Sequence, residues 1–387
     1  MNFVLFDEID IWKNFLPLTF TKPISEIRIG ILTIKQKWDI ALNTNCSYLS
    51  QSYLEKKHPV LINLENIFIN SKYCPNSNIV ELINTLKPNQ CICSDKKIIA
   101  FYGNTNDFKL LNNFQKIVFS DSIFELSNVC AIYQKNAEAL IEDFKIITKN
   151  KSSLPLSETV RVIGDKNLVF LEAGAKAEAC IFNTSNGPIY LGINSEVMEG
   201  SAVRGPFALG DNSMLKLNTK IYGATTIGPH CKIGGEINNS VVFGYSNKAH
   251  DGFLGNSVIG EWCNLGADTN TSNLKNNYSH VKLYNYLQKK SIDTGLQFCG
   301  LIMGDYSKSG INTMFNTGSV VGVGTNIFGG GFPPTYIPNF SWGGSNGLEK
   351  YRIDKLIETT EKVFERRGLS FNQIEKELLN SILSFNE

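Results

Sequence analysis

Aliphatic residues recur every six positions through the middle of the chain. Eight consecutive members are Leu, Ile or Val: Leu191, Val197, Val203, Leu209, Leu215, Ile221, Ile227 and Ile233. Small side chains follow four positions later at six of the first seven: Ser195, Ser201, Ser213, Thr219, Thr225 and Cys231. A helical period of 3.6 or a strand period of two does not produce six. The pattern predicts a parallel β-helix with three short strands per coil of about 18 residues, aliphatic side chains inside and small ones at the turns.

Hexads over residues 165–330 predict about nine coils. A second run in the same frame supports this extent: Ser307, Thr313, Ser319 and Thr325. The pattern disappears over residues 272–296, where polar and aromatic residues accumulate. Such an insertion lies on one face of a repeat protein, often the binding face.

The regions on either side of the repeat have different patterns. Apolar runs at residues 3–6, 60–64, 98–102 and 117–119 alternate with helical spacing at residues 27–42 and 137–148. That alternation predicts an α/β sheet domain. Apolar residues at helical intervals over residues 349–385 predict two helices broken near Gly368. The expected domains are therefore residues 1–155 (α/β, Rossmann-like), 160–335 (β-helix) and 349–387 (helices).

Glycine content supports this division into domains, and charge and cysteine spacing bear on the expected partners and location. Residues 1–163 hold only two glycines, whereas residues 164–347 hold 29. With 37 basic and 36 acidic residues among 387, the charge gives no reason to expect nucleic acid or a membrane as partner. The N-terminus lacks the pattern of a secretory signal, so a cytoplasmic location is expected. Nine cysteines without a CxxC pair are interpreted as mostly buried free thiols.

Residues 248–269, KAHDGFLGNSVIGEWCNLGADT, followed by SNLK at 272–275, carry a resemblance. They are similar to the acetyltransferase segment of the bifunctional UDP-N-acetylglucosamine pyrophosphorylase/glucosamine-1-phosphate N-acetyltransferases. That family's pattern is approximately K-A-x-H-L-x-Y-x-G-D, then N-x-G-A-G-T, then an N-Y or N-L-R/K turn. The resemblance implies a left-handed β-helix, acetyl-CoA as cosubstrate, an amino-sugar phosphate as acceptor and a homotrimer.

The resemblance also implies roles for single residues. His250 takes the place of the general base, and an imidazole with a pKa near 6.5 suits removal of a proton from an amine. A histidine on a surface turn is the alternative for this position. The other assigned roles are substrate binding by Lys248, Phe253, Asn264 and Asn273, and acetyl-CoA binding by Ala267, Gly310 and Asn312.

Several positions depart from the family pattern. Phe253 stands where Tyr is usual, Asp251 replaces Leu and Asp268 replaces Gly. The family's phosphate-binding basic residues do not align. The substitute candidates are Arg204, Lys220, Lys232 and Lys248, each of which is also interpretable as a solvated charge.

The N-terminal region lacks the glycine-rich loop, roughly L-x-x-G-x-G-T-R, with which sugar nucleotidyltransferases bind phosphates, because the first glycine is Gly30. It retains LPLTFTKP at residues 16–23, which resembles the opening of a divergent bacterial group of the same family. Lys22 and Arg28 are candidates to pair with UTP phosphates, and Asn63 to contact a base or sugar. The resemblance allows Mg²⁺ in this half, and a vestigial domain is the alternative.

The function predicted is acetyl-CoA-dependent N-acetylation of glucosamine-1-phosphate, with uridylyl transfer by residues 1–155 left open. A zinc hydratase resembling γ-class carbonic anhydrase is a second enzyme class, but His230, His250 and His280 lack that family's close pair of ligands. The non-enzymatic alternative is a regulatory or scaffold subunit. The missing glycine loop favours it, and the presence of His250 with Asn264 opposes it.

Overall fold

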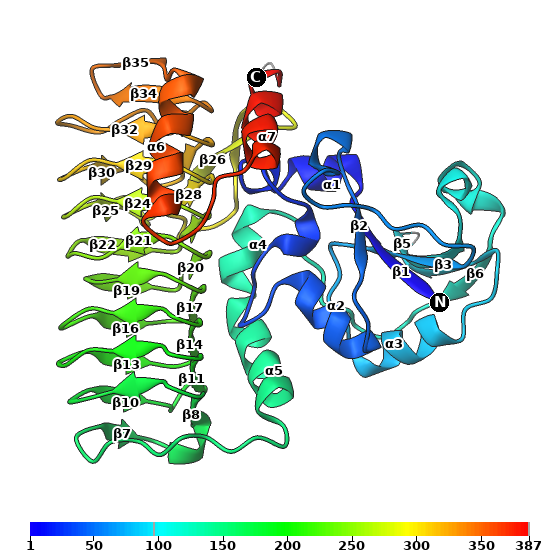
Figure 1. Ribbon diagram of the computed structural model, residues 1–387, viewed down its shortest axis with the longest axis horizontal. Helices are drawn as coiled ribbons and strands as arrows, with labels where there is room; N and C mark the ends of the chain where they lie inside the picture. Colours follow the sequence, from blue (N-terminus) through cyan, green and yellow to red (C-terminus); the bar gives the residue numbers. More distant parts are fainter. Residues whose placement is uncertain (96, 386–387) are drawn as a thin grey trace. The chain divides into compact units, whose positions relative to one another are not determined.

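The computed structural model describes residues 1–95 and 97–385, and its chain trace is drawn in Figure 1. The contacts divide the chain into two compact units. The first comprises Met1–Phe15, Thr21–Ile27 and Leu32–Asn128. The second comprises Leu16–Phe20, Arg28–Ile31 and Val129–Glu387. Each unit is described by itself.

The first unit is built on a six-stranded mixed sheet in the order β2-β1-β3-β5-β4-β6. Its strands are β1 (Asn2–Phe6), β2 (Ser47–Leu49), β3 (Asn66–Asn70), β4 (Gln90–Ser94), β5 (Lys97–Gly103) and β6 (Gln115–Val118). Its α-helices are α1 (Ile9–Lys13), α2 (Ile34–Leu42) and α3 (Ser77–Asn84). Strand β1 pairs in parallel with both β2 and β3, so it lies where the chain changes direction across the sheet.

Most expected elements of this region are confirmed, and two are corrected. The strand expected at residues 60–64 is wrong, since that segment is irregular and the strand begins at Asn66. The helical spacing at residues 27–42 yields a helix only from Ile34. The helix begins there because Thr33 and Gln36 form a capping box that satisfies its first amides.

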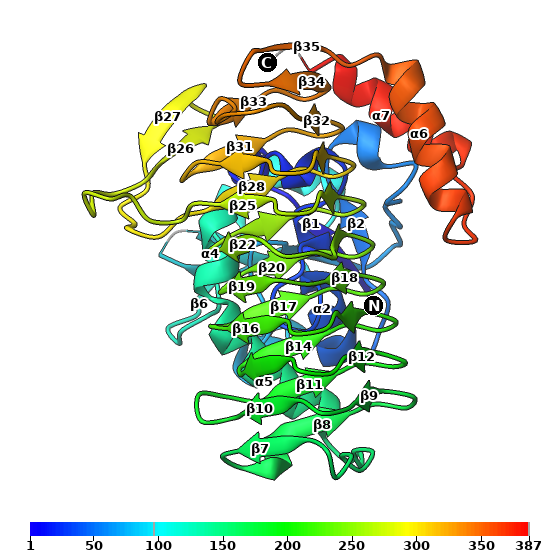
Figure 2. The same cartoon turned by 90° about the vertical axis from the view of Figure 1, so that its left-hand side faces the viewer.

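The second unit is a parallel β-solenoid whose coils are stacked in Figure 2. Face A contains β7 (Arg161–Ile163), β10 (Ile181–Asn183), β13 (Ala202–Arg204), β16 (Lys220–Tyr222), β19 (Glu236–Asn238) and β22 (Phe253–Gly255), beyond which lie β25 (Asn270–Thr271) and β30 (Met314–Phe315). Face B contains β8 (Val169–Leu171), β11 (Ile189–Leu191), β14 (Phe207–Leu209), β17 (Thr225–Ile227), β20 (Val241–Val242), β23 (Val258–Ile259), β28 (Leu301–Met303), β31 (Ser319–Val321) and β33 (Tyr336–Ile337). Face C contains β9 (Lys176–Ala177), β12 (Glu196–Val197), β15 (Met214–Leu215), β18 (Lys232–Ile233), β21 (Asn247–Lys248), β24 (Asn264–Leu265), β29 (Lys308–Ser309), β32 (Asn326–Ile327), β34 (Ser341–Gly344) and the antiparallel β35 (Gly347–Lys350).

The interior of the solenoid confirms the six-residue pattern. All eight aliphatic residues of the run are at most 1% exposed, and the six small residues that follow them are equally buried. Aliphatic side chains of successive coils stack into one continuous core. All nine cysteines are buried free thiols.

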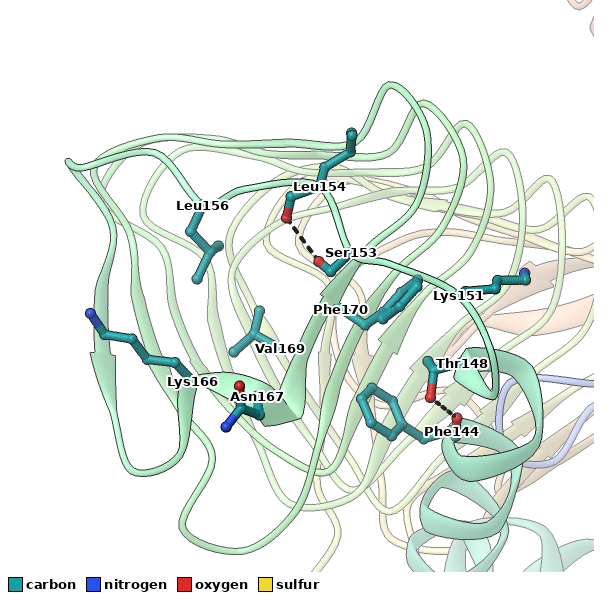
Figure 3. Close-up of a pocket in the computed structure, with 10 residues that line it drawn as sticks. All are labelled: Phe144, Thr148, Lys151, Ser153, Leu154, Leu156, Lys166, Asn167, Val169 and Phe170. Carbon is teal, nitrogen blue, oxygen red and sulfur yellow. Dashed lines mark hydrogen bonds between the residues drawn. The ribbon is translucent and has the colours of Figure 1, made fainter.

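Two helices cover part of face B. Helix α4 (Val129–Gln134) contacts β23, and helix α5 (Asn136–Thr148) contacts β17. Outward residues of face B such as Phe170 and Tyr190 pack against Leu140 and Phe144 of α5. The segment after α5 crosses the first coil, and a cavity of about 380 Å³ lies there. Phe144, Leu156 and Val169 are among the residues that line it (Figure 3).

The expected insertion and C-terminal helices are both present. The insertion leaves the corner between faces A and B and forms the hairpin β26 (Lys282–Asn285) and β27 (Lys290–Asp293). The last helices are α6 (Ile353–Glu365) and α7 (Gln373–Leu383). They follow the corner between faces B and C, where Tyr245 stacks on Trp262 at 4.2 Å and Trp262 on Phe364 at 3.9 Å between ring centroids.

Candidate functional site

His250 lies on the corner between faces C and A, in the turn that joins β21 to β22. Its side chain is exposed. The next coil stacks directly on this turn, because the Asp268 amide donates to the Asp251 carbonyl over 3.0 Å. One coil further, the Asn312 amide donates to the Ala267 carbonyl over 2.9 Å. His250, the expected general base, therefore lies at the same corner as Ala267 and Asn312, which were assigned to acetyl-CoA binding.

The backbone beside this corner is closely packed. A Cβ atom added to Gly266 would lie 2.6 Å from the carbonyl carbon of Gly310, a distance that side chains do not adopt. Glycine is therefore required at Gly266 by the approach of the neighbouring coil. Gly266 and Gly310 are partly exposed, so no side chain projects from these two positions next to the His250 corner.

Phe253 and Asn273 converge on face A. A Cβ atom on Gly255 would lie 2.5 Å from Cζ of Phe253 and 2.6 Å from Nδ2 of Asn273, so both side chains occupy the space above that glycine. Asn273 Nδ2 donates to Asn256 Oδ1 over 2.8 Å, which fixes the orientation of its amide. The two expected substrate contacts thus form one group.

The remaining candidates of the solenoid are more dispersed. Asn264 is exposed on face C, on the other side of the corner from Phe253. Arg204 and Lys220 are exposed on face A, and Lys232 on face C, in coils that precede His250. Lys248 is the exception, since only 2% of its surface is exposed and its Nζ donates to the His250 carbonyl over 2.9 Å.

In the first unit, polar residues gather where the three parallel strands end. Asp7 follows β1, Ser50 follows β2 and Ser71 follows β3. Asp7 Oδ2 accepts from Ser50 Oγ at 2.6 Å and from the Ile24 amide at 3.1 Å. Burial raises the pKa of Asp7 to about 6 against the opposing effect of these hydrogen bonds. Ligands of α/β sheets bind at such a switch point, outside the carboxyl ends of strands.

Sequence reasoning missed Asp7. Its Oδ1 is buried and has no hydrogen-bond partner among the described residues, so the carboxylate retains an acceptor for a ligand. The signal that would have found it is an acidic residue directly after the first apolar run, which becomes informative only once β1 is known to lie between β2 and β3.

The three nucleotide-binding candidates differ in burial and in the unit to which they belong. Lys22 is 2% exposed and belongs to the first unit. Arg28 belongs to the second unit, where its guanidinium donates to the Ile31 carbonyl. Asn63 is exposed, and its backbone pairs with the Asn66 side chain over 2.8 and 2.7 Å.

The histidines do not form a metal centre. His230 stacks on Tyr245 at the corner between faces B and C. Its pKa is lowered mainly by burial and, to a smaller extent, by the positive charge of the nearby Arg367. His280 lies in the insertion, 3.5 Å from Asp293. Among residues 1–95 and 97–385 no three His, Cys, Asp or Glu side chains are grouped to hold a metal ion. None of the helices in the described part combines the length and hydropathy that crossing a bilayer requires.

Comparison with known proteins finds a family match for the N-terminal part of the chain and distant relatives that are bifunctional proteins. Residues 3–152 match the family model described as sugar nucleotidyl transferase. The bifunctional protein GlmU of Methanocaldococcus jannaschii is 31% identical over 139 residues, which are 36% of this chain and 28% of that protein. A bifunctional sugar-1-phosphate nucleotidylyltransferase/acetyltransferase of Sulfurisphaera tokodaii is 25% identical over 355 residues, covering 80% of this chain and 81% of that protein.

Among solved structures, the polysialic-acid-specific acetyltransferase NeuO covers 55% of this chain and 99% of its own at 15% identity and a TM-score of 0.29. That similarity is too low to support a functional argument. The chain thus joins a sugar nucleotidyl transferase-type domain to a parallel β-solenoid, and it is a distant relative of GlmU and of bifunctional sugar-1-phosphate nucleotidylyltransferase/acetyltransferases.

Proposed function

We propose that the solenoid transfers an acetyl group from acetyl-CoA to the amine of glucosamine-1-phosphate. The observation that carries this proposal is the exposed His250 turn stacked beneath Ala267 and Asn312 at one corner. The Sulfurisphaera tokodaii relative, named as a bifunctional sugar-1-phosphate nucleotidylyltransferase/acetyltransferase, supports the same pairing of acyl and nucleotidyl transfer.

The proposed chemistry assigns one task to each group. The amine nitrogen attacks the thioester carbonyl, and His250 accepts the proton that the nitrogen loses. The Ala267 amide stabilises the negative charge that develops on the carbonyl oxygen. The carbon–sulfur bond then breaks, and the CoA thiolate leaves with a proton returned by His250. Phe253 and Asn273 hold the sugar, with Asn264 contributing from face C.

Release of CoA thiol from acetyl-CoA in the presence of glucosamine-1-phosphate tests this proposal. We expect turnover that requires the amino sugar, and none with N-acetylglucosamine-1-phosphate, whose nitrogen is already acylated. Equal thiol release with both sugars would contradict N-acetylation of this acceptor. No release with any amino-sugar phosphate would favour the regulatory or scaffold role.

We further propose that the first unit transfers UMP from UTP to N-acetylglucosamine-1-phosphate and releases pyrophosphate. The match to a sugar nucleotidyl transferase model and the buried Lys22 support this step. Asp7 fits a magnesium ion, because its buried Oδ1 retains an acceptor and Mg²⁺ binds one or two carboxylates together with substrate phosphates. When bound, the ion would neutralise phosphate charge that the missing glycine loop leaves uncompensated.

The proposed assembly is a homotrimer, and sedimentation equilibrium measures it directly.

Pyrophosphate release from UTP, measured with and without Mg²⁺, tests the nucleotidyl half. Its absence under both conditions would indicate that the first unit is vestigial or regulatory.

A further inference from the structure

Lys248 occupies a position that the solenoid otherwise gives to aliphatic side chains. It stands in the inward column of face C, where its register partner in the preceding coil is Ile233. Leu215 lies below in the same column, and Leu265 is the inward residue of the next strand. A lysine that is only 2% exposed is costly at such a place, because its charge loses most of its hydration.

The neighbouring coils explain the space that Lys248 fills. At other turns of this corner a buried hydroxyl satisfies an inward carbonyl. Thr219 Oγ1 donates to the Lys216 carbonyl over 2.6 Å, and Thr313 Oγ1 donates to the Gly310 carbonyl over 2.9 Å. The turn between β18 and β19 consists only of Gly234 and Gly235, so it has no residue to supply a hydroxyl.

At this turn the ammonium group of Lys248 donates the hydrogen bond that a hydroxyl donates elsewhere, and it also donates a second one. Its Nζ donates to the Gly234 carbonyl over 3.4 Å and to the His250 carbonyl over 2.9 Å. Burial lowers the pKa of Lys248 to about 8, while the nearby carboxylates Asp251 and Asp268 act in the opposite direction. One buried cation therefore ties the turn that carries His250 to the turn beneath it.

We propose that Lys248 is a positioning residue that holds the His250 turn in its reactive geometry from inside the solenoid, and that it does not contact the acceptor. This inference rests on the proposed acyl transfer. It replaces the substrate-binding role expected for Lys248, since the side chain points into the interior and toward backbone carbonyls.

The test compares Lys248→Met, Lys248→Arg and His250→Ala with the double variant that combines Lys248→Met and His250→Ala. Met has a similar length and restores the apolar column, so the solenoid should fold. The matched control is Thr219→Val, which removes a buried hydrogen bond at the same corner two turns earlier. Thermal melts followed by circular dichroism report folding, and CoA release reports kcat and the KM for glucosamine-1-phosphate.

We expect Lys248→Met to lower kcat by roughly tenfold or more, because small displacements of a catalytic group have effects of that size. The KM for the amino sugar should change by less than about threefold, since uniform substrate binding is not affected. Lys248→Arg should recover part of kcat because it keeps a buried donor. The double variant should be no slower than His250→Ala, because two residues that act as a unit are not additive.

Three results would overturn the inference. A raised KM with unchanged kcat would make Lys248 a substrate contact. A kcat for Lys248→Met equal to that of Thr219→Val would make its role structural only. Additive losses in the double variant would show action independent of His250. Failure of the proposed function is distinguishable, because the unaltered protein would then release no CoA.

Discussion

The solenoid and the α/β unit build their candidate sites in opposite ways. In the solenoid, the His250 turn, Ala267 and Asn312 meet because successive coils return the chain to the same corner. In the α/β unit, Asp7, Ser50 and Ser71 meet because three strands far apart in sequence end at one sheet edge. The first arrangement can be obtained from residue spacing alone. The second requires the order of the strands.

The largest effect should come from a charge in the repeat's interior. Ile227→Asp places an unpaired carboxylate between coils packed above and below, where water cannot reach it. We expect a loss of more than about 4 kcal/mol in unfolding free energy or no folded solenoid at all. Urea denaturation followed by circular dichroism measures it. Lys220→Asp on the exposed surface of face A is the control, and equal stability of the two variants would refute the inward register.

The next largest effect is expected on the rate of acetyl transfer, at the His250 corner between faces C and A. His250→Ala should lower acetyl transfer by roughly 10²-fold or more, as loss of a general base commonly does. Leu217→Ala, an exposed residue at the same corner two turns earlier, should keep the full rate. Circular dichroism should show both variants folded. An unchanged rate in His250→Ala would remove this histidine from the mechanism.

A third prediction separates the nucleotide candidates. Lys22→Ala should lower pyrophosphate release by about 10- to 100-fold, because the loss of a hydrogen bond to a charged group has an effect of that size. The same variant should leave CoA release unchanged. Arg28→Ala should have a smaller effect on pyrophosphate release, because the Arg28 guanidinium already donates to the Ile31 carbonyl. Both activities are measured on the same preparation. A loss of CoA release in Lys22→Ala would show that the two activities are not separate.

The smallest effect is on stability as a function of pH. Burial raises the pKa of Asp7 from 3.8 to about 6, so the folded state binds a proton more tightly and wild-type stability falls as pH rises between these values. Asp7→Asn removes that loss and should stabilise the protein by about 1–2 kcal/mol at pH 7.5, allowing for partial exposure. Denaturation at pH 7.5 and pH 4 should show the gain only at the higher pH. An equal gain at both values would contradict the raised pKa.

How much of the structure could be predicted from the sequence differs between the solenoid and the α/β unit. The inward positions of the solenoid could be predicted because each depends on a fixed spacing, and residues such as Leu209 and Ile221 are buried as expected. The spacing fails after Ile233, where the turn shortens to Gly234 and Gly235. Lys248 then falls on an inward position, so its contact with the His250 carbonyl could not be predicted from hexads.

Prediction was weaker in the α/β unit for a related reason. The apolar run at residues 60–64 has the composition of a strand, yet the exposed Leu61 and Leu64 show that it lies outside the core. Local pattern does not reveal which apolar runs find a partner strand. Asp7 was missed on the same grounds, because its environment depends on β2 and β3.

The corner between faces B and C changes its residue type along the solenoid. Early coils place Asn194 and Asn212 there in the left-handed conformation, which asparagine adopts readily. Later coils place aromatic residues in the same conformation, including Tyr245 and Trp262 at φ near 61°. An aromatic residue there is strained by about 1–3 kcal/mol, and here it stacks on its neighbours and on helix α6. In related sequences, the switch from asparagine to aromatic residues at this corner should therefore mark the coils over which C-terminal helices are folded back.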